Sequence, residues 1–269
     1  MSRIASRMQQ LRDSQKKAFI PYIVAGDPCL EATLPCLHAL VESGADILEL
    51  GVPFSDPMAE GPVIQMGHER ALEHHTTLLQ VLEIVREFRL TDDMTPIVLM
   101  GYANPVEVMG YQAFAEAAAK AGVDGVLLVD MPPEESAELQ ASLKAQALDQ
   151  IFLIAPTTTA ARIESICRLA SGYIYYVSLK GVTGAGHLDT AEVQEKVLQV
   201  KTQTSLPVCV GFGIRDADSA QKIASVADGV VVGSVLVADM GKSAGAAVDN
   251  IVSSVAKVAA QINEGVRRP

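Results

Sequence analysis

The chain has 269 residues, of which 49% are hydrophobic and 20% charged, and this composition supports a substantial buried core and excludes a disordered protein. A formal net charge of −11 excludes a basic surface for nucleic acid or for an anionic membrane, so a bound anion would need a local site built from backbone N–H groups. None of the four cysteines forms a C-x-x-C pair, which argues against a zinc site and a disulfide framework and indicates reduced thiols in a cytoplasmic protein.

The first residues are rich in serine and arginine, as in a transit peptide, but no apolar h-region follows them. Ile4, Met8 and Leu11 instead repeat with helical spacing and predict a short packed helix. No later run reaches the ~18 apolar residues expected of a membrane span, so we expect a soluble protein.

Beyond that helix, short strands rich in Val, Ile and Leu alternate with helical segments, without a linker or a shift in composition. The expected strands are residues 18–26, 46–51, 96–101, 125–130, 151–155, 173–177, 207–211 and 229–233, and the expected helices include residues 31–43, 63–90, 111–121, a segment that starts at residue 132, and 244–261.

Continuous apolar strands are buried on both faces, which is typical of parallel sheets in α/β proteins. A doubly wound sheet would also fit this pattern. Regular eightfold alternation at this length favours a closed (β/α)8 TIM barrel, and we expect residues 1–269 to form one such domain.

The second expected strand carries a carboxylate in its interior, where a charge is costly unless it is paired or used. In an extended chain Leu48 and Leu50 share one face, and Glu49 lies on the other. If the leucines meet a covering helix, Glu49 points into the barrel. Burial there should raise its pKa and poise it to exchange protons.

In a barrel, function gathers where the strands end. Asp27, Asp56, Glu60 and Asp130 lie near the same rim as Glu49, although Asp27 and Asp130 could equally serve as salt-bridge partners or helix caps. The histidines form no evident ligand set, so no metal is expected. Apolar and aromatic side chains at this end could enclose a flat ring, or could simply belong to the core: Tyr22, Met100, Leu127, Tyr175 and Phe212.

Glycines follow three consecutive strands, in the segments 181–186, 211–213 and 233–234. Exposed backbone amides there, with the N-terminus of a short helix after the last strand, would form a cradle for a phosphate group. The loop at residues 178–188 is long enough to act as a lid, or it is an ordinary connection.

These motifs resemble the tryptophan synthase alpha subunit family over essentially the whole chain. The most specific one is Glu-Leu-Gly-Val-Pro-Phe-Ser-Asp-Pro at residues 49–57, followed by Ala59 and by Gly61-Pro62. The later glycine segments match the family's loops in order and spacing.

The resemblance implies a (β/α)8 barrel whose extra N-terminal helix closes its base. It implies retro-aldol cleavage of indole-3-glycerol phosphate to indole and glyceraldehyde 3-phosphate, without a cofactor in this chain. Indole would then pass to a beta subunit that carries pyridoxal phosphate, in a complex of two alpha and two beta chains.

By the same resemblance, Glu49 would carry out the proton transfers and Glu60 would stabilise positive charge on the indole nitrogen. The remaining expected roles are phosphate binding by Gly184, Gly213, Gly233 and Ser234, lid closure with Thr183, and partner contacts through Asp56, Pro57 and Asn104.

The family normally has aspartate where this chain has Glu60, and the extra methylene moves the carboxylate. We expect a pocket reshaped to fit glutamate, because the rest of the motif is intact. Two alternatives stay open at this point: a Schiff-base aldolase that uses Lys180, just beyond the sixth strand, and a weakly active or non-catalytic barrel that activates its partner.

Overall fold

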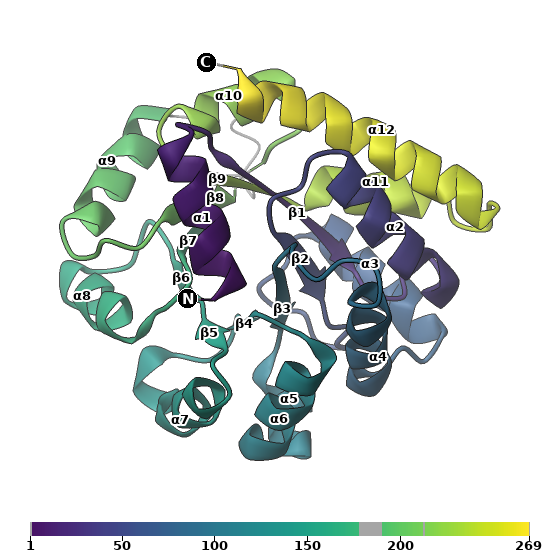
Figure 1. Cartoon of the computed structure of the whole chain (residues 1–269), viewed down its shortest axis with the longest axis horizontal. Helices are drawn as coiled ribbons and strands as arrows, with labels where there is room; N and C mark the ends of the chain where they lie inside the picture. Colours follow the sequence, from purple (N-terminus) through teal and green to yellow (C-terminus); the bar gives the residue numbers. More distant parts are fainter. Residues whose placement is uncertain (1, 178–189, 212, 269) are drawn as a thin grey trace.

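The computed structural model describes residues 2–177, 190–211 and 213–268. Within these ranges, parallel strands form one sheet in the order β5-β4-β3-β2-β1-β9-β8-β7-β6. The two outermost strands of that order, β5 and β6, are separated in sequence by Ile151 alone, so the sheet returns on itself as a barrel (Figure 1). The strands are β1 (Ala18–Val24), β2 (Leu48–Gly51), β3 (Ile97–Gly101), β4 (Gly125–Leu128), β5 (Asp149–Gln150), β6 (Phe152–Ile154), β7 (Ile174–Val177), β8 (Val208–Gly211) and β9 (Gly229–Val232).

Helices surround this sheet on its outer side, and one helix lies across an end of the barrel (Figure 1). They are α1 (Arg3–Asp13), α2 (Leu30–Glu42), α3 (Pro62–Glu73), α4 (Leu78–Phe88), α5 (Ala103–Met109), α6 (Tyr111–Ala121), α7 (Ala137–Ala145), α8 (Ala160–Leu169), α9 (Thr190–Lys201), α10 (Ala217–Ala224), α11 (Ser234–Lys242) and α12 (Val248–Arg267), with a 3-10 turn η1 (Pro133–Glu135).

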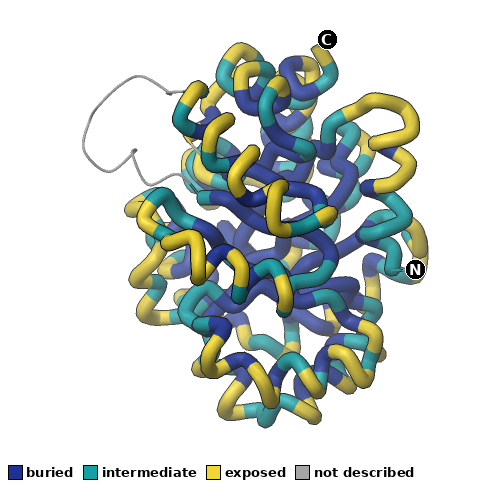
Figure 2. The backbone as a smooth tube through the Cα atoms, turned by 90° about the vertical axis from the view of Figure 1, so that its left-hand side faces the viewer, coloured by how far each residue is buried: buried dark blue, intermediate teal, exposed yellow. Residues whose placement is uncertain are grey.

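The buried side chains form two layers, one between the strands and the outer helices and one inside the barrel. Figure 2 shows the strands buried and the outward sides of the helices exposed. Leu48 and Leu50 belong to the outer layer, where they join Leu37 of α2, whereas Ile47 belongs to the inner layer. The predicted orientation of β2 is therefore confirmed, and with it the inward direction of Glu49.

Helix α1 closes the end of the barrel at which the strands begin. Its Ile4, Met8 and Leu11 are buried in the inner layer, and Ile4 lies against Gly125, the first residue of β4. The predicted N-terminal helix at the base is confirmed.

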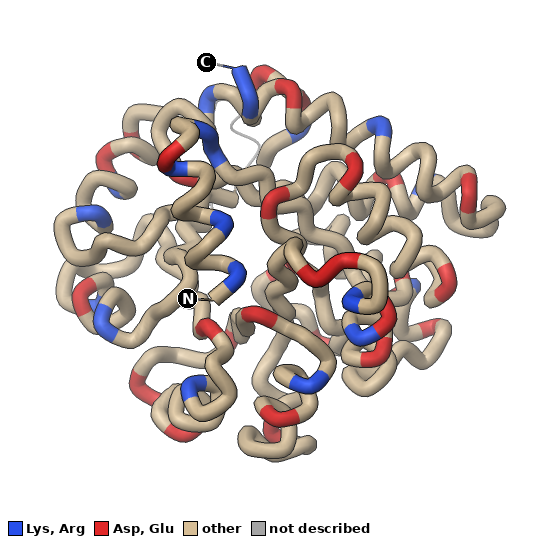
Figure 3. Tube along the Cα trace, viewed as in Figure 1, with Lys and Arg blue, Asp and Glu red and all other residues tan. Residues whose placement is uncertain are grey.

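Three aspartates just before or at the start of strands tie this base together. Each accepts a hydrogen bond from the backbone N–H of a residue at the start of a neighbouring strand. This N–H has no partner in the hydrogen bonds between the strands. Arginines pair with two of these carboxylates, and Figure 3 shows basic residues on α1 at this end. The three bonds run from Phe19 to Asp46 (2.7 Å), from Ile97 to Asp124 (2.8 Å) and from Val208 to Asp228 (2.9 Å).

Some predicted boundaries are wrong. The helix predicted for residues 63–90 is two helices, because His75 adopts a φ of 56° and Thr77 starts α4 with a capping box. The closing helix begins at Val248 and not at Ala244, since Gly245 has a φ of 80°, which is not compatible with a helix at this position. The strand predicted for residues 151–155 is observed as two short strands, β5 and β6, on either side of Ile151, and α5 was not predicted. Among the described residues, no helix has the length and apolar character needed to span a membrane.

Candidate active site

Glu49 lies inside the barrel on β2, next to Tyr22 in the register with β1, and its side chain is completely buried. Its Oε1 accepts a hydrogen bond from the hydroxyl of Tyr173, just before β7. Because β2 and β7 are not neighbours in the sheet, this bond crosses the barrel interior. Its Oε2 is buried without a hydrogen-bond partner among the residues the structure describes. One oxygen thus holds the carboxyl in place, and the other forms no hydrogen bond within the described part of the chain.

The pKa of Glu49 is raised to about 8, mainly by burial and to a smaller extent by the nearby carboxyl of Glu60. The Tyr173 hydrogen bond acts in the opposite direction, because a donor stabilises the charged form. A carboxyl with a pKa near the working pH can both give and take a proton, which suits a general acid–base.

Glu60 lies at the end of the loop that leads from β2 into α3, and it is half-buried. Burial raises its pKa to about 7. The loop is held on both sides of this residue: the Ala59 N–H donates to the Tyr102 hydroxyl at 3.2 Å, and the Gln65 side chain donates to the Glu60 carbonyl at 2.9 Å. The structure therefore brings a second titratable carboxyl close enough to raise the pKa of Glu49.

Four of the five side chains predicted to enclose a flat ring, Tyr22, Met100, Leu127 and Tyr175, share the inner layer of the core. The fifth, Phe212, lies outside the described residues. Burial raises the pKa of Tyr22 and of Tyr175 well above the usual value, and both carboxyls add to this, so the two phenols stay neutral beside the acids.

Glycines on the neighbouring strands make room for these two tyrosines. A Cβ atom at Gly51 would overlap the Tyr22 hydroxyl, and one at Gly211 would overlap the Tyr175 hydroxyl. Each glycine stands two residues beyond the register partner of its tyrosine, so each ring leans toward the carboxyl ends of the strands. Both hydroxyls therefore lie above the layer that contains Glu49.

The predicted phosphate site is described only in part. Gly213 has a φ of 38° and an open surface where a Cβ would be, and it follows β8. Gly233 and Ser234 start α11 directly after β9, where the first N–H groups of a helix have no partners within it. Since β8 and β9 are neighbours in register, these residues lie at one edge of the barrel mouth. Thr183 and Gly184 lie outside the described residues, as does Lys180.

The remaining acidic residues of the rim divide into structural and exposed ones. Asp27 is buried and forms a two-pronged ion pair with Arg70, with contacts of 2.6 and 2.9 Å. Asp130 accepts the N–H of Ala103 at 2.7 Å, at the start of α5. Both therefore have structural roles, one of the two readings that the sequence left open. Asp56 is exposed at the rim, Asn104 is exposed, and Pro57 is half-buried.

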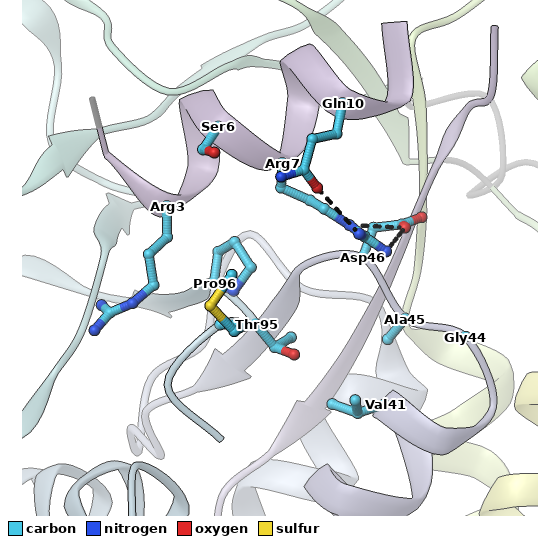
Figure 4. A pocket seen from close by; sticks show the side chains of 11 residues that line it. Arg3, Ser6, Arg7, Gln10, Val41, Gly44, Ala45, Asp46, Thr95 and Pro96 are labelled. Carbon is cyan, nitrogen blue, oxygen red and sulfur yellow. Dashed lines mark hydrogen bonds and ion pairs between the residues drawn. The ribbon is translucent and has the colours of Figure 1, made fainter. Parts of the chain in front are cut away.

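A cavity of about 230 Å³ lies at the other end of the barrel, between α1 and the loops that precede β2 and β3 (Figure 4). Arg7 projects across it to Asp46 and Gln10, and Arg3 pairs with Asp124. Its charged groups are paired within the protein, and the bottom of a (β/α)8 barrel serves stability. We therefore place the candidate site at the mouth, around Glu49.

Sequence reasoning missed three residues of this site. Tyr173 shares the strand face of Tyr175 by simple alternation, so its inward direction could have been found. Tyr102 follows β3 at the rim and binds the Glu60 loop. His68 lies in α3 and contacts both Tyr22 and the backbone of Phe54, which no periodicity would indicate.

Comparison with known proteins gives a consistent result over the whole chain. A family model described as tryptophan synthase alpha chain matches residues 8–267. The tryptophan synthase alpha chain of Dechloromonas aromatica (strain RCB) is 56% identical over 266 residues, which cover 99% of this chain and 98% of that one. That of Thioalkalivibrio sulfidiphilus (strain HL-EbGR7) is 61% identical over 237 residues, 88% of this chain and 89% of that one. The crystal structure of tryptophan synthase subunit alpha from Legionella pneumophila str. Paris aligns with a TM-score of 0.91 at 44% identity and covers 99% of this chain and 98% of that chain.

The raised pKa of Glu49 predicts a pH-dependent effect of Glu49→Gln on stability. The folded protein keeps the Glu49 proton up to about pH 8, whereas the unfolded chain loses it near pH 4.5, so wild-type stability falls as the pH rises between these values. Glutamine cannot ionise and can still accept the Tyr173 hydrogen bond. We expect the variant to unfold with a free energy about 1–3 kcal/mol above that of wild type at pH 9, and with no such gain at pH 4.5.

Urea unfolding at the two pH values measures this difference. Equal stability at pH 9 would show that Glu49 is ionised at little cost in the folded protein and would contradict the assignment.

Proposed function

Because the chain belongs to the tryptophan synthase alpha chain family, we propose that it cleaves indole-3-glycerol phosphate to indole and glyceraldehyde 3-phosphate by carboxyl acid–base catalysis. The observation that carries this proposal is the state of Glu49: a buried carboxyl with one oxygen bound by Tyr173, the other without a partner among the described residues, and a pKa of about 8.

The chemistry needs a group that first gives a proton and then takes one. Protonated Glu49 delivers its proton to C3 of the indole ring, which makes the ring an electron sink. The resulting carboxylate removes the proton of the adjacent glycerol hydroxyl, the bond between C3 and the glycerol carbon breaks, and its electrons return to the ring. Glu49 ends the cycle protonated, as it began, so no metal or lysine adduct takes part in the proposed steps.

Glu60 serves the intermediate of this sequence. Protonation at C3 places positive charge on the ring nitrogen, and an ionised carboxylate near the N–H stabilises that charge. The position of the Glu60 backbone between Tyr102 and Gln65 supports this role. Its pKa of about 7 leaves a substantial fraction ionised at neutral pH.

The phosphate group binds to the backbone amides of Gly213, Gly233 and Ser234, with Gly184 as a further member by family resemblance, and Thr183 belongs to the lid that closes over the site. Helix α11 supplies the positive end of its dipole and its free N–H groups at this point, which explains how an acidic chain can hold a phosphate. The flat indole ring occupies the space among Tyr22, Met100, Leu127 and Tyr175, with Phe212 as a further wall expected from the sequence.

Membership of the tryptophan synthase alpha chain family implies a beta-subunit partner that carries the pyridoxal phosphate. We propose that Asp56, Pro57 and Asn104 contact this partner, in a complex of two alpha and two beta chains in the cytoplasm. Large apolar side chains at the same rim support a protein contact there, since Met58 is 75% exposed and Val108 is 82% exposed.

The two alternatives, a Schiff-base aldolase through Lys180 and a non-catalytic barrel that activates its partner, are not favoured by the family assignment.

Glu49→Gln tests the proposal directly. Because it removes the group that performs both proton transfers, we expect indole release to fall at least about 10³-fold, with glyceraldehyde 3-phosphate still bound as in wild type. Glu83→Gln, the same change at an exposed ion pair on α4, is the matched control and should retain full activity. Indole is measured with the chain alone and with a beta subunit added. Turnover that survives in Glu49→Gln, or a wild-type chain that stays inactive under both conditions, contradicts the proposal.

Glu60→Asp tests whether the pocket is built for the longer side chain. A displacement on the order of 1 Å at a catalytic centre can cost about 10²-fold, so shortening the side chain in a pocket fitted to glutamate should slow indole release. We expect the variant to be slower than wild type in the same assay. A variant at least about a hundredfold faster would show that glutamate is misplaced here and that the family's aspartate is the better fit.

A further inference from the structure

His68 lies on α3, is 1% exposed and contacts two parts of the candidate site at once. Its Nδ1 accepts the backbone N–H of Phe54 at 3.1 Å, and its Nε2 is 3.3 Å from the Tyr22 hydroxyl. Phe54 belongs to the loop that carries Glu60, and Tyr22 belongs to β1 beside Glu49. The imidazole ring therefore joins the loop of one carboxyl to the neighbour of the other.

The two hydrogen bonds determine where the ring carries its proton. A backbone N–H can only donate, so Nδ1 must be the unprotonated nitrogen. Burial lowers the pKa of His68 to about 4, so the ring is neutral near pH 7 and its single proton is on Nε2. Nε2–H then donates to the Tyr22 oxygen, and the hydroxyl proton of Tyr22 must point away from His68.

The surroundings of Tyr22 show what that proton can reach. The hydroxyl lies over Gly51, two residues beyond Glu49 on the same inward face of β2, and the ring lies against Gly233 on its other side. The charges of Glu60 and Glu49 both act on Tyr22, in that order of strength. The phenol thus lies at the barrel mouth close to both carboxyls, and its hydroxyl proton is not used by His68.

The Glu60 loop is held at two points by aromatic residues. Near its start, Phe54 binds His68 through its N–H and stacks on Tyr102 with ring centroids 5.2 Å apart. Near its end, the Ala59 N–H donates to the Tyr102 hydroxyl. Loss of the His68 contact would release the start of this loop and the orientation of Tyr22 together.

We propose that His68 is a positioning residue of this site. With its proton on Nε2, the ring fixes the Glu60 loop and turns the Tyr22 hydroxyl proton toward the reacting groups near Glu49 and Glu60. Tyr22 is accordingly a hydrogen-bond donor of the site as well as part of its apolar wall. The inference rests on the proposed cleavage reaction. If His68 only filled space in the core, the reaction rate would not depend on the polar atoms of His68 and Tyr22.

A double-mutant cycle of His68→Leu and Tyr22→Phe tests this arrangement through indole release. We expect each single change to lower kcat about tenfold with a change in KM of less than about threefold, as for one or two hydrogen bonds that orient reacting groups. The double variant should be no slower than His68→Leu, because the two residues act as one unit. His68→Gln, which can both accept and donate, should recover most of kcat. His38→Leu is the matched control, since His38 stacks on Phe88 between outer helices, and it should keep wild-type kcat.

Nitrogen-15 NMR of the histidine rings in the wild-type protein tests the tautomer without any turnover, with His68→Gln to assign the signal. We expect a neutral ring at pH 7 that is protonated on Nε2.

A wild-type kcat in His68→Leu, single effects that multiply in the double variant, or a ring protonated on Nδ1 would each overturn the inference. A wild-type protein that releases no indole would instead contradict the proposed function, and the NMR result would still decide the tautomer. If His68→Leu does not fold, Tyr22→Phe and the NMR measurement test the proposal.

Discussion

The burial of one carboxyl inside the barrel is the constraint on which the site depends. Glu49 occupies a position where an ionised group is costly, and among the described residues its carboxyl receives one hydrogen bond, from Tyr173 across the barrel. That bond orients the carboxyl without restoring the normal acidity, so the pKa stays near 8. More hydrogen-bond donors would have stabilised the ionised carboxylate, which cannot give a proton. Without any donor, the carboxyl group would have been free to move.

The remaining features of the mouth follow from the same constraint. The neutral phenols of Tyr22 and Tyr175 enclose the acid with polar atoms that carry no charge. Glycines at their sides let these rings lean over the layer that contains Glu49. At the opposite end, α1 and the aspartates at the strand starts hold the barrel closed. The groups that close the barrel and the candidate active site therefore lie at opposite ends of the same sheet.

Sequence reasoning succeeded where a short-range rule decides the outcome. Alternation along β2 placed Glu49 inside and Leu48 and Leu50 outside, and the order of strands and helices indicated the barrel. It failed where local backbone or distant contacts decide. The left-handed conformation of His75 divided one expected helix into two, and the contact of His68 with Tyr22 joins residues 46 positions apart. Asp27 could be assigned to Arg70 only once the fold had brought them together.

The most direct measurement is the titration of Glu49 itself in the wild-type protein. Carbon-13 NMR of labelled glutamate carboxyls, with Glu49→Gln to assign the signal, follows its protonation as the pH rises. The buried position of Glu49, with Tyr173 as its hydrogen-bond donor, predicts a midpoint near pH 8. A midpoint near the ordinary value of 4.5 would mean that Glu49 is ionised at neutral pH, and it would contradict the assignment of this residue as the group that delivers the proton.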